Sequence, residues 1–507
     1  MDSWALISVS DKRGLVDLAR WLVDQGLQLL ATQSTATALS ESGFTVHTVE
    51  SLTGFGEILD GRVKTLHPKV YAGLLADESL AHHRAQREAL EAPRIDVVVV
   101  NLYPYETALE QNAPLADRIE SIDIGGVALI RAAAKNFARV IPVVDPEQYA
   151  EFMQKPLHEW TLNERRLWAQ AALYHTAWYD AMIASTLGPL PEGWWPRRWA
   201  IGGTRQESLR YGENPHQPAA FYRWPGPGGV AHGTLLQGKA LSYNNWADLD
   251  TAWRLAASLE EEPAAVVVKH QTPCAVAVAD TVNEAYRKAH DADPVSIFGG
   301  IVAVNRPVDT SLAEALTDLF LEVVVAPDFT PEALATLGRK KNLRVFQVPA
   351  GAHPMDWEVR SVTGGLLVQA RDDHYSAWDR WTRVAGPDWA GRVSPADLRL
   401  AWASVAMVKS NAIVVVNHGV TVGIGGGQTN RVDAARQALE RAGANAQGAV
   451  LASDGFFPFG DVLELCQAYG IAVVIEPGGS VRDQESVEKA EQYGITLLFT
   501  GERHFRH

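Results

Sequence analysis

Apolar runs and helical patterns alternate along the first third of the chain. Short apolar runs with the length and composition of buried strands are residues 4–10, 27–32, 44–50, 96–105 and 140–145. Between them lie stretches such as residues 11–26 and 125–140, in which apolar positions recur at the spacing of an amphipathic helix. Strands that alternate with helices predict an α/β domain with a parallel sheet covered on both faces.

A domain boundary is predicted near residue 195. Residues 157–187 have a helical pattern throughout, and the segment after them is rich in Pro, Gly and Trp, which is typical of a boundary. After about residue 200 the α/β pattern returns with longer connections. Its predicted strands are residues 264–270, 299–305, 322–327, 411–425, 448–455, 471–477 and 495–500. We therefore expect one domain over residues 1–195 and a second region over residues 200–507.

Two stretches of the second region, residues 264–330 and 405–500, have a similar layout. In each stretch a strand with a polar end is followed by a helix. The similarity predicts a pair of related halves.

Composition is that of an ordinary globular protein, since 47% of the 507 residues are apolar and 21% are charged. The formal net charge of -15 argues against broad binding of nucleic acid or anionic membranes, although local cation clusters can still bind small anions. Cys274 and Cys466 are too few for a disulfide framework, as expected in a reducing compartment. The start lacks the layout of a signal peptide, and no apolar run approaches the roughly 18 residues that span a bilayer. We expect a cytoplasmic protein without a nucleic-acid or membrane partner.

One predicted strand ends in a cation beside an imidazole, Lys269-His270, with Pro273-Cys274 close behind. The pair Pro-Cys is part of the zinc signature of nucleobase deaminases, so a metal site is one interpretation. The second cysteine of that signature is absent, because Ala277 stands in its place, and no His-x-Glu half accompanies it. We therefore expect no catalytic metal. Lys269 and His270 remain as a candidate acid–base pair, since an imidazole titrates near neutral pH.

Polar side chains also gather where the predicted strands of the first third end. Ser10 and Lys12 lie at a strand-to-helix turn and could bind a phosphate, although an N-cap would also explain the serine. Arg62, Lys64 and Thr65 crowd one short non-helical segment and suit a phosphate or a developing oxyanion.

Further candidates follow the strongest predicted strand. Asn101 and Tyr103 come at its end, where ligands of parallel sheets collect, although a tyrosine often only packs its ring there. Asp123 precedes Gly126 at a predicted helix start, where glycine allows close approach of a ligand. Lys135 lies later in the same helical pattern.

The second region contains similar polar segments. Arg210, Tyr211 and His216 fall among turn residues, whose presence alone does not explain this combination. Residues 423–431 are dense in glycine but match neither a dinucleotide fingerprint nor a Walker sequence.

Together these segments resemble the family of bifunctional purine-biosynthesis enzymes that join AICAR formyltransferase and IMP cyclohydrolase. The resemblance spans nearly the whole chain. The segments that carry it are, in order, SVSDKRGL, GRVKTLHP, NLYPY, IDIGGVALIRAAAKN, LRYGENPHQ, KH-x-x-PC, FGGIVAVNR, SNAI, GGGQTNR, SDGFFPF and TGERHFRH. Each segment alone is a modest match, whereas all of them in this order are specific.

The resemblance implies a methylglyoxal-synthase-like cyclohydrolase domain in residues 1–195. It implies two cytidine-deaminase-like subdomains without zinc in residues 200–507, acting as the formyltransferase. The family transfers a formyl group from the co-substrate 10-formyltetrahydrofolate to AICAR, and then closes formyl-AICAR to IMP with loss of water. It works as a homodimer with composite transferase sites and needs no metal or nicotinamide.

The resemblance also implies site residues. In the transfer, His270 is the expected base, and Lys269 stabilises the oxyanion or assists protonation at the folate N10. The residues expected to bind or position AICAR and folate are Arg210, Tyr211, His216, Asn411, Arg431, Phe457 and His507.

For ring closure, the expected catalytic set is Lys64, Tyr103, Asp123 and Lys135. The expected nucleotide-binding positions are Ser10, Lys12, Arg62, Thr65, Asn101 and Gly126, with Ser34 able to donate a further hydrogen bond.

The chain departs from the family pattern at a few positions. Gln33 and Ser34 stand where two glycines are usual, and their side chains could narrow the phosphate pocket. Gly460 stands where an arginine is usual, so one expected cation is missing, and Thr272 and Ala275 also differ. One alternative is therefore a transferase alone, with a nucleotide-binding first domain. Another is a purine-nucleotide sensor, which would not need the proton-transfer residues.

Overall fold

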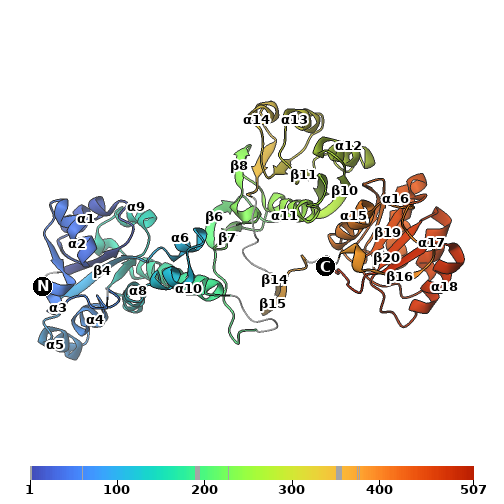
Figure 1. Cartoon of the computed structure of the whole chain (residues 1–507). Helices are drawn as coiled ribbons and strands as arrows, with labels where there is room; N and C mark the ends of the chain where they lie inside the picture. Colours follow the sequence, from blue (N-terminus) through green and yellow to red (C-terminus); the bar gives the residue numbers. More distant parts are fainter. Residues whose placement is uncertain are drawn as a thin grey trace. The chain divides into compact units, whose positions relative to one another are not determined.

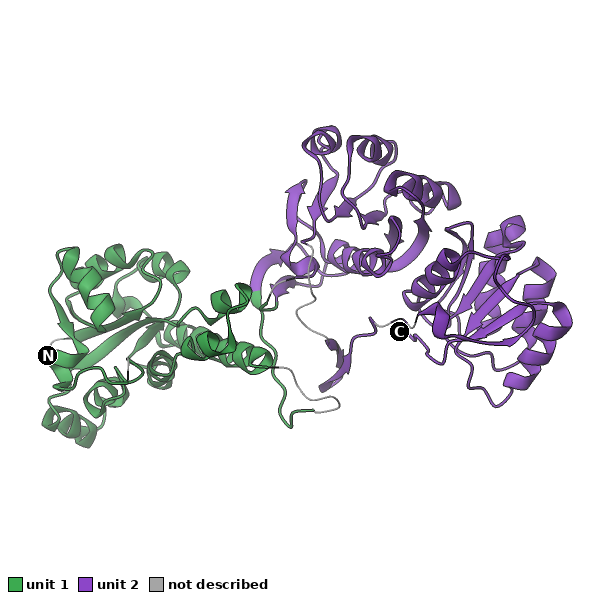
Figure 2. Ribbon diagram, in the orientation of Figure 1, with its two compact units in different colours: residues 1–204, 224–226 green, residues 205–223, 227–507 purple. Residues whose placement is uncertain are grey.

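The computed structural model describes residues 3–59, 61–188, 195–226, 228–349, 357–373, 375 and 377–507. The chain forms two compact units (Figure 2). Unit 1 comprises residues 1–204 and 224–226, and unit 2 comprises residues 205–223 and 227–507. Each unit contains its own sheet, and the two are described separately.

Unit 1 is built on a five-stranded parallel sheet of order β3-β2-β1-β4-β5 (Figure 1). The strands are β1 (Ser3–Val9), β2 (Leu27–Ala31), β3 (Val46–Thr48), β4 (Arg94–Asn101) and β5 (Ile141–Val143). The predicted parallel sheet is thus confirmed.

Helices connect and cover these strands. They are α1 (Leu15–Asp24), α2 (Gln33–Glu41), α3 (Val49–Thr53), α4 (Pro68–Leu75), α5 (Ala81–Ala89), α6 (Tyr105–Glu110), α7 (Leu115–Glu120), α8 (Gly125–Lys135), α9 (Tyr149–Phe152) and α10 (Leu162–Thr186), with 3-10 turns η1 (Pro146–Gln148) and η2 (Leu157–Glu159). Val97 and Val99 of β4 pack in one apolar cluster with α1, whereas Val98 and Val100 pack in another with α8. The alternation shows that both faces of the sheet are covered.

Several boundaries differ from the sequence prediction: the strand predicted over residues 96–105 ends at Asn101 and the helix predicted over residues 125–140 ends at Lys135. Two further differences have a clear local cause. The long helix begins at Leu162 instead of residue 157, because Thr161 and Glu164 form a capping box that fixes its start. The strand predicted over residues 44–50 is reduced to β3, because Thr48 accepts a hydrogen bond from the Ser51 N–H and caps α3.

Unit 2 contains a twelve-stranded sheet of order β16-β21-β20-β19-β17-β18-β10-β9-β11-β12-β13-β8. The strands are β8 (Thr234–Gln237), β9 (Ala264–Lys269), β10 (Thr272–Val278), β11 (Ile301–Val304), β12 (Val323–Ala326), β13 (Arg344–Gln347), β16 (Thr382–Ala385), β17 (Ile413–Asn417), β18 (Val420–Gly425), β19 (Val450–Ser453), β20 (Val473–Glu476) and β21 (Thr496–Phe499).

The helices of unit 2 lie between these strands in chain order. They are α11 (Tyr243–Ser258), α12 (Val282–Ala292), α13 (Thr310–Thr317), α14 (Pro331–Leu337), α15 (Pro395–Ala406), α16 (Arg431–Ala442), α17 (Asp461–Tyr469) and α18 (Asp483–Tyr493), with 3-10 turns η3 (Val230–His232), η4 (Trp378–Arg380) and η5 (Gly443–Ala446). Two hairpins stand apart from the large sheet, namely β6 (Thr204–Leu209) with β7 (Ala219–Arg223), and β14 (Trp357–Val362) with β15 (Gly365–Ala370).

The large sheet consists of two equivalent halves. In the first half β10, β9 and β11 pair antiparallel, and β11, β12 and β13 pair parallel. In the second half β18, β17 and β19 pair antiparallel, and β19, β20 and β21 pair parallel. An antiparallel contact between β10 and β18 joins the halves. The predicted pair of related halves is therefore confirmed.

The single strand predicted over residues 411–425 is wrong. It is the hairpin of β17 and β18, broken by a two-residue turn at His418 and Gly419. Both turn residues have positive φ, 51° and 77°, as a type I′ turn requires. The continuous apolar run hides this turn, because only two residues interrupt it.

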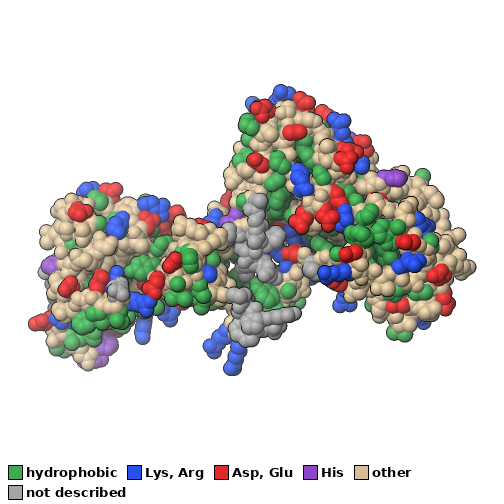
Figure 3. All heavy atoms as spheres, in the orientation of Figure 1, with side chains coloured by type: hydrophobic (Ala, Val, Ile, Leu, Met, Phe, Trp, Pro, Cys, Tyr) green, Lys and Arg blue, Asp and Glu red, His purple; other side chains and the backbone are tan. Residues whose placement is uncertain are grey.

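The surface and the helices add two further observations. Acidic and basic side chains are interspersed over the face of each unit shown in Figure 3. Among the described residues, no helix combines the length and the apolar character that crossing a membrane requires.

Candidate functional site

A cavity of about 660 Å³ opens in unit 1 beyond the carboxyl ends of β1, β2 and β4. This is the edge of a parallel sheet at which ligands collect. Ten of the eleven residues that the sequence predicts for this domain line the cavity, namely Ser10, Lys12, Ser34, Arg62, Lys64, Thr65, Asn101, Tyr103, Asp123 and Gly126. The structure therefore brings together residues from five separate segments of the chain.

Asn101, at the end of β4, holds the turn that follows β1. Its Oδ1 accepts hydrogen bonds from the Ser10 N–H at 2.6 Å, the Ser10 hydroxyl at 2.8 Å and the Asp11 N–H at 2.9 Å. Its Nδ2 donates to the Asp11 carbonyl at 2.8 Å. Because both polar atoms of the amide are engaged, Asn101 shapes the wall of the cavity by fixing this turn.

Lys64 supplies a cation to the same cavity. Its Nζ lies 3.3 Å from the Tyr103 hydroxyl and 3.7 Å from a Glu57 carboxylate oxygen. Burial alone would lower the pKa of Lys64, but Tyr103 and Glu57 outweigh it and hold this pKa above its ordinary value. Lys64 is therefore an ammonium ion at neutral pH.

Asp123 supplies a carboxyl group that is mostly shielded from solvent. Burial raises the pKa of Asp123, while backbone N–H donors and Lys64 act in the opposite direction. The Gly126 N–H donates to Asp123 Oδ1 at 2.6 Å. A Cβ at Gly126 would come 2.6 Å from the other carboxylate oxygen, so glycine is needed at this helix start. The carboxyl is thus held in place by α8.

Tyr179 of α10 fixes the loop that carries Asp123. Its hydroxyl donates to the Ser121 carbonyl at 2.9 Å and accepts the Asp123 N–H at 3.0 Å. The ring is only 2% exposed. Sequence reasoning missed this residue, because no local pattern distinguishes it from the other aromatic residues of α10.

Lys135 does not lie in this cavity. It ends α8, whereas Gly126 is the second residue of this helix, and the helical rise between the two is about 13 Å. Lys135 is also exposed. Lys135 and Asp123 are therefore close in sequence, but Lys135 does not reach the cavity of Asp123 within one chain.

Gln33 and Ser34, which the resemblance places where glycines are usual, differ in their relation to the cavity. Ser34 lines the wall at the start of α2, and its hydroxyl lies 3.3 Å from Lys12 Nζ. Gln33 is exposed and is not among the lining residues. Ser34 is therefore part of the cavity wall, whereas Gln33 is not.

In unit 2, His270 lies at the tip of the β9–β10 hairpin. His270 and Gln271 form its two-residue turn with φ of 56° and 59°, values that non-glycine residues rarely adopt. Asp248 of α11 holds the turn, accepting the Gln271 N–H at 2.6 Å and the His270 N–H at 3.2 Å. Lys269 Nζ donates to the Phe298 carbonyl at 2.9 Å. Lys269 and His270, the two residues predicted to act in formyl transfer, are thus fixed by hydrogen bonds to residues outside the hairpin.

A cavity of about 310 Å³ lies beside this turn. Its lining includes His270 and three cationic side chains, Lys269, Lys409 and Arg441, and contains no carboxylate. Cys274 also lines it, and burial raises the pKa of this thiol to about 12, so the sulfur stays neutral. The arrangement favours an anionic ligand next to an imidazole.

The second half of unit 2 contains the equivalent turn, with an asparagine in the place of the lysine. His418 occupies the position of His270, and the Gly419 N–H donates to the Asp397 carboxylate at 2.6 Å. Asn417 stands where the first half has Lys269. Only the first of the two related turns therefore has a lysine directly before its histidine. At the second turn the ammonium ion comes from α12, where Lys288 Nζ donates to the His418 carbonyl at 3.4 Å.

The remaining predicted residues of unit 2 do not line the cavity of His270 within one chain. These are Arg210, Tyr211, His216, Asn411, Arg431, Phe457 and His507. Arg431 and Phe457 are 6% and 0% exposed, so in this structure their side chains are not presented to a ligand. The Arg431 guanidinium forms a buried ion pair with Asp454.

The other members of this set also lie elsewhere in unit 2. Arg210 follows β6, and its guanidinium lies 5.5 Å from the centre of the Tyr211 ring. His216 is exposed in the connection between β6 and β7. The side chain of Asn411 donates to the Gln428 carbonyl at 2.9 Å, and the His507 ring lies 6.0 Å from that of Phe505.

A lysine from another helix lies beside Gly460, the position where the resemblance leads one to expect a cation. A Cβ on Gly460 would meet the side chain of Lys489 at 2.6 Å. Lys489 comes from α18 and pairs with Glu464 of α17. A lysine therefore lies beside the glycine that replaces the usual arginine.

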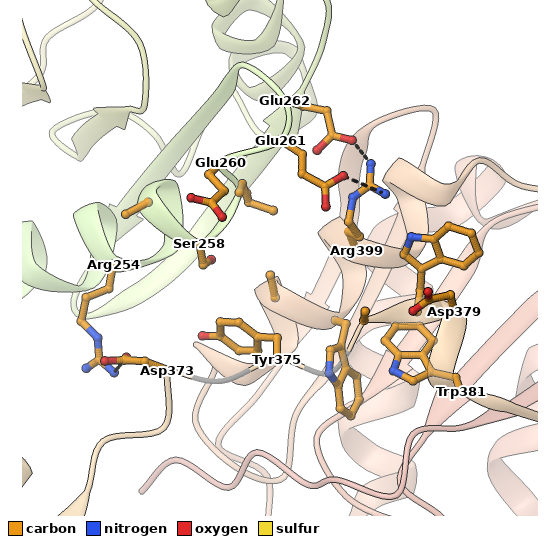
Figure 4. A pocket seen from close by; sticks show the side chains of 16 residues that line it. Arg254, Ser258, Glu260, Glu261, Glu262, Asp373, Tyr375, Asp379, Trp381 and Arg399 are labelled. Atoms are coloured by element: carbon orange, nitrogen blue, oxygen red, sulfur yellow. Dashed lines mark hydrogen bonds and ion pairs between the residues drawn. The ribbon is translucent and has the colours of Figure 1, made fainter. Parts of the chain in front are cut away.

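Another cavity of about 610 Å³ lies between the end of α11 and the start of α15, and none of the predicted site residues lines it (Figure 4). Arg399 points toward Glu261 and Glu262 and pairs with both. Arg254 pairs with Asp373 at 2.9 Å. These ion pairs join the two halves of unit 2.

Among the described residues, no group of three or more His, Cys, Asp or Glu side chains could hold a metal ion.

Comparisons with known proteins cover the whole chain. The model of the AICARFT/IMPCHase bienzyme matches residues 133–441, and the model of the MGS-like domain matches residues 14–128. The chain is 48% identical to the bifunctional purine biosynthesis protein PurH of Anoxybacillus flavithermus, over 99% of both chains. It is 47% identical to the protein of that name from Mycobacterium marinum, over 99% of this chain and 98% of the relative.

Among solved structures, that of ForH is 33% identical, covers 36% of this chain and 95% of its own, and has a TM-score of 0.33. The fold described above therefore rests on this chain's own structure. The bienzyme model matches more than half of the chain, and the two relatives match it over nearly their full length. The chain belongs to the AICARFT/IMPCHase bienzyme family.

Proposed function

We propose that the chain catalyses the last two steps of de novo IMP synthesis. AICAR takes a formyl group from 10-formyltetrahydrofolate, and formyl-AICAR then closes to IMP. The observation that carries the proposal is the convergence of ten predicted residues on one cavity in a member of this family. A transferase alone or a nucleotide sensor is disfavoured, because Lys64, Tyr103 and Asp123 share that cavity.

We assign formyl transfer to the cavity of His270 in the region of residues 200–507. The 5-amino nitrogen of AICAR bonds to the formyl carbon and loses a proton, which His270 accepts. The bond from that carbon to the folate N10 breaks, and N10 takes a proton. Lys269, held by the Phe298 carbonyl, stabilises the oxyanion of the tetrahedral intermediate. The cationic lining of the cavity favours the anionic substrates.

We assign ring closure to the larger cavity in the domain of residues 1–195. The carboxamide nitrogen of formyl-AICAR bonds to the formyl carbon, and Asp123 takes its proton. Lys64 stabilises the negative charge that develops on the formyl oxygen. That oxygen leaves as water, with one proton from the carboxamide nitrogen and one from the formamide nitrogen. Ser10, Lys12, Ser34, Arg62 and Thr65 bind the phosphate and ribose of the nucleotide.

The direct test supplies the purified chain with AICAR and 10-formyltetrahydrofolate and measures formyl-AICAR and IMP over time. We expect both, with IMP formed faster than in a matched sample of formyl-AICAR without enzyme. Formyl-AICAR without enzyme-dependent IMP would support the transferase alone. The absence of both products would contradict the proposal.

We further propose a cytoplasmic homodimer whose transfer sites are composite. Arg210, Tyr211 and His216 lie outside the cavity of His270 in their own chain, although the resemblance assigns them to the same site. A second copy of the chain can supply them, since closed two-fold dimers are the commonest oligomers.

Composite sites predict complementation between two inactive variants. Arg210→Ala and His270→Ala should each lose formyl transfer alone. After mixing in equal amounts and re-equilibration, half of the dimers are mixed, and each mixed dimer has one intact site. We therefore expect about a quarter of the wild-type activity. Two His270→Ala preparations mixed in the same way serve as the control. No recovery, with mixed dimers demonstrated, would place all site residues in one chain.

A further inference from the structure

Glu476 is a buried carboxyl group that the proposed mechanism does not use. It ends β20 and is 0% exposed. One carboxyl oxygen, Oε2, accepts the Phe457 N–H at 2.8 Å. The other, Oε1, has no hydrogen-bond partner within the described part of the chain. A carboxylate in such a site would be poorly solvated on one side.

The cation that acts on Glu476, Arg431, is already paired with another carboxylate. Arg431 of α16 forms its ion pair with Asp454, which is also 0% exposed and follows β19. The other charged group that acts on Glu476 is Asp483 at the start of α18, and it is negative. Two buried carboxyl groups therefore share one guanidinium.

The pairing of Arg431 with Asp454 organises the surrounding loops. Asp454 accepts hydrogen bonds from the Ser410 hydroxyl and, at 3.0 Å, from the Ala412 N–H. Arg431 also donates to the Ala412 carbonyl at 3.3 Å. A negative charge on Glu476 would compete for the guanidinium and weaken these contacts.

We propose that Glu476 is protonated in the folded protein and, as a neutral acid, is a positioning residue of the formyl-transfer site. It acts through Arg431 and Asp454, because α16, which Arg431 begins, also carries Arg441, and Ser410, which bonds to Asp454, follows Lys409. Arg441 and Lys409 both line the cavity of His270. Glu476 holds the loop of residues 454–459 through Phe457 and leaves Arg431 to Asp454. The functional part of this inference rests on the proposed function.

The electrostatic surroundings agree with this geometry. The pKa of Glu476 is raised from 4.5 to about 8, mainly by burial and in part by Asp483, while Arg431 and the backbone N–H groups of Phe457 and Gly478 act in the opposite direction. The folded state then keeps a proton that the unfolded state loses, so the contribution of Glu476 to stability falls as pH rises from 4.5 to about 8. Above that pH it is constant.

The test compares wild type, Glu476→Gln and Glu476→Leu as full chains from pH 5 to 9. Formyl transfer is measured with AICAR and 10-formyltetrahydrofolate, and closure of added formyl-AICAR is measured in the same preparations to show that unit 1 is intact. Thermal midpoints are recorded at each pH. Glu488→Gln, which removes an exposed carboxylate of α18, is the matched control.

We expect Glu476→Gln to transfer formyl groups within about twofold of wild type at pH 7, because the amide keeps the acceptor for Phe457. Its thermal midpoint should gain on that of wild type as pH rises toward 8, and its transfer activity should fall less above pH 8. Glu476→Leu leaves the Phe457 N–H unpaired and should lose about tenfold in transfer. Glu488→Gln should follow wild type.

A thermal midpoint difference between Glu476→Gln and wild type that does not change with pH would overturn the inference. So would a large loss of transfer in Glu476→Gln at pH 7. If wild type makes no formyl-AICAR at any pH, the proposed function fails, but the thermal comparison still decides the protonation of Glu476.

Discussion

Replacing His270 with alanine is expected to lower the rate of formyl transfer by about 10²- to 10⁴-fold, the usual contribution of a general base. The reason is chemical, because the amine of AICAR must lose a proton and His270 is the imidazole that lines the cavity. Closure of added formyl-AICAR should be unchanged, since the cavity assigned to it lies in unit 1. The measurement is the initial rate of each reaction on the same preparation.

The second half of unit 2 provides a matched control for this variant. His418→Ala changes an exposed histidine in the equivalent turn of the second half, where no lysine precedes it. We expect both activities to survive this change. Equal losses of transfer in the two variants would indicate that the turns act only through folding. Loss of ring closure in His270→Ala would show that the two sites are coupled.

The fold is readable from the sequence where apolar runs are bounded by clear breaks. The parallel sheet of unit 1 and the repeat of unit 2 follow from runs that end in polar residues. The hairpin of β17 and β18 does not, because its turn has only His418 and Gly419 between two apolar strands. Two residues are too few to break a hydrophobic pattern, although their backbone reverses the chain.

The cavity of unit 1 was predictable because a parallel sheet gathers its strand ends at one edge. Ser10 directly follows β1 and Asn101 ends β4, so the sheet itself brings them together. Lys135 lies at the end of a helix, and each residue of a helix adds to the distance along its axis. The helix therefore carries Lys135 away from the cavity.

The buried charges of unit 2 were not predictable in the same way. Arg431 begins a helix and Glu476 ends a strand, both of which are ordinary places for exposed polar residues. Their burial depends on Asp454 and Phe457, which are distant in sequence and close only after folding. Tyr179 escapes prediction for the same reason.

Replacing Asp123 with asparagine should remove ring closure while formyl transfer continues. The amide retains an oxygen that can accept the Gly126 N–H, so the start of α8 keeps its hydrogen bond. What is lost is the group that takes the proton, and we expect closure to fall by about 10²- to 10⁴-fold. Formyl-AICAR should then accumulate when the variant is supplied with AICAR and 10-formyltetrahydrofolate. Asp117→Asn, an exposed change in α7, is the matched control.

The pH dependence of closure tests the same assignment independently. Burial raises the pKa of Asp123 above the ordinary aspartate value, and the carboxylate that accepts the proton exists only above this pKa. The rate for wild type should therefore fall on acidification at a higher pH than an exposed aspartate would give. The amide that replaces this carboxyl group cannot titrate, so the residual rate of the Asp123→Asn variant should lose this acidic limb. An acidic limb that persists unchanged in the variant would assign the proton transfer to another group, leaving Asp123 as a residue that only orients α8.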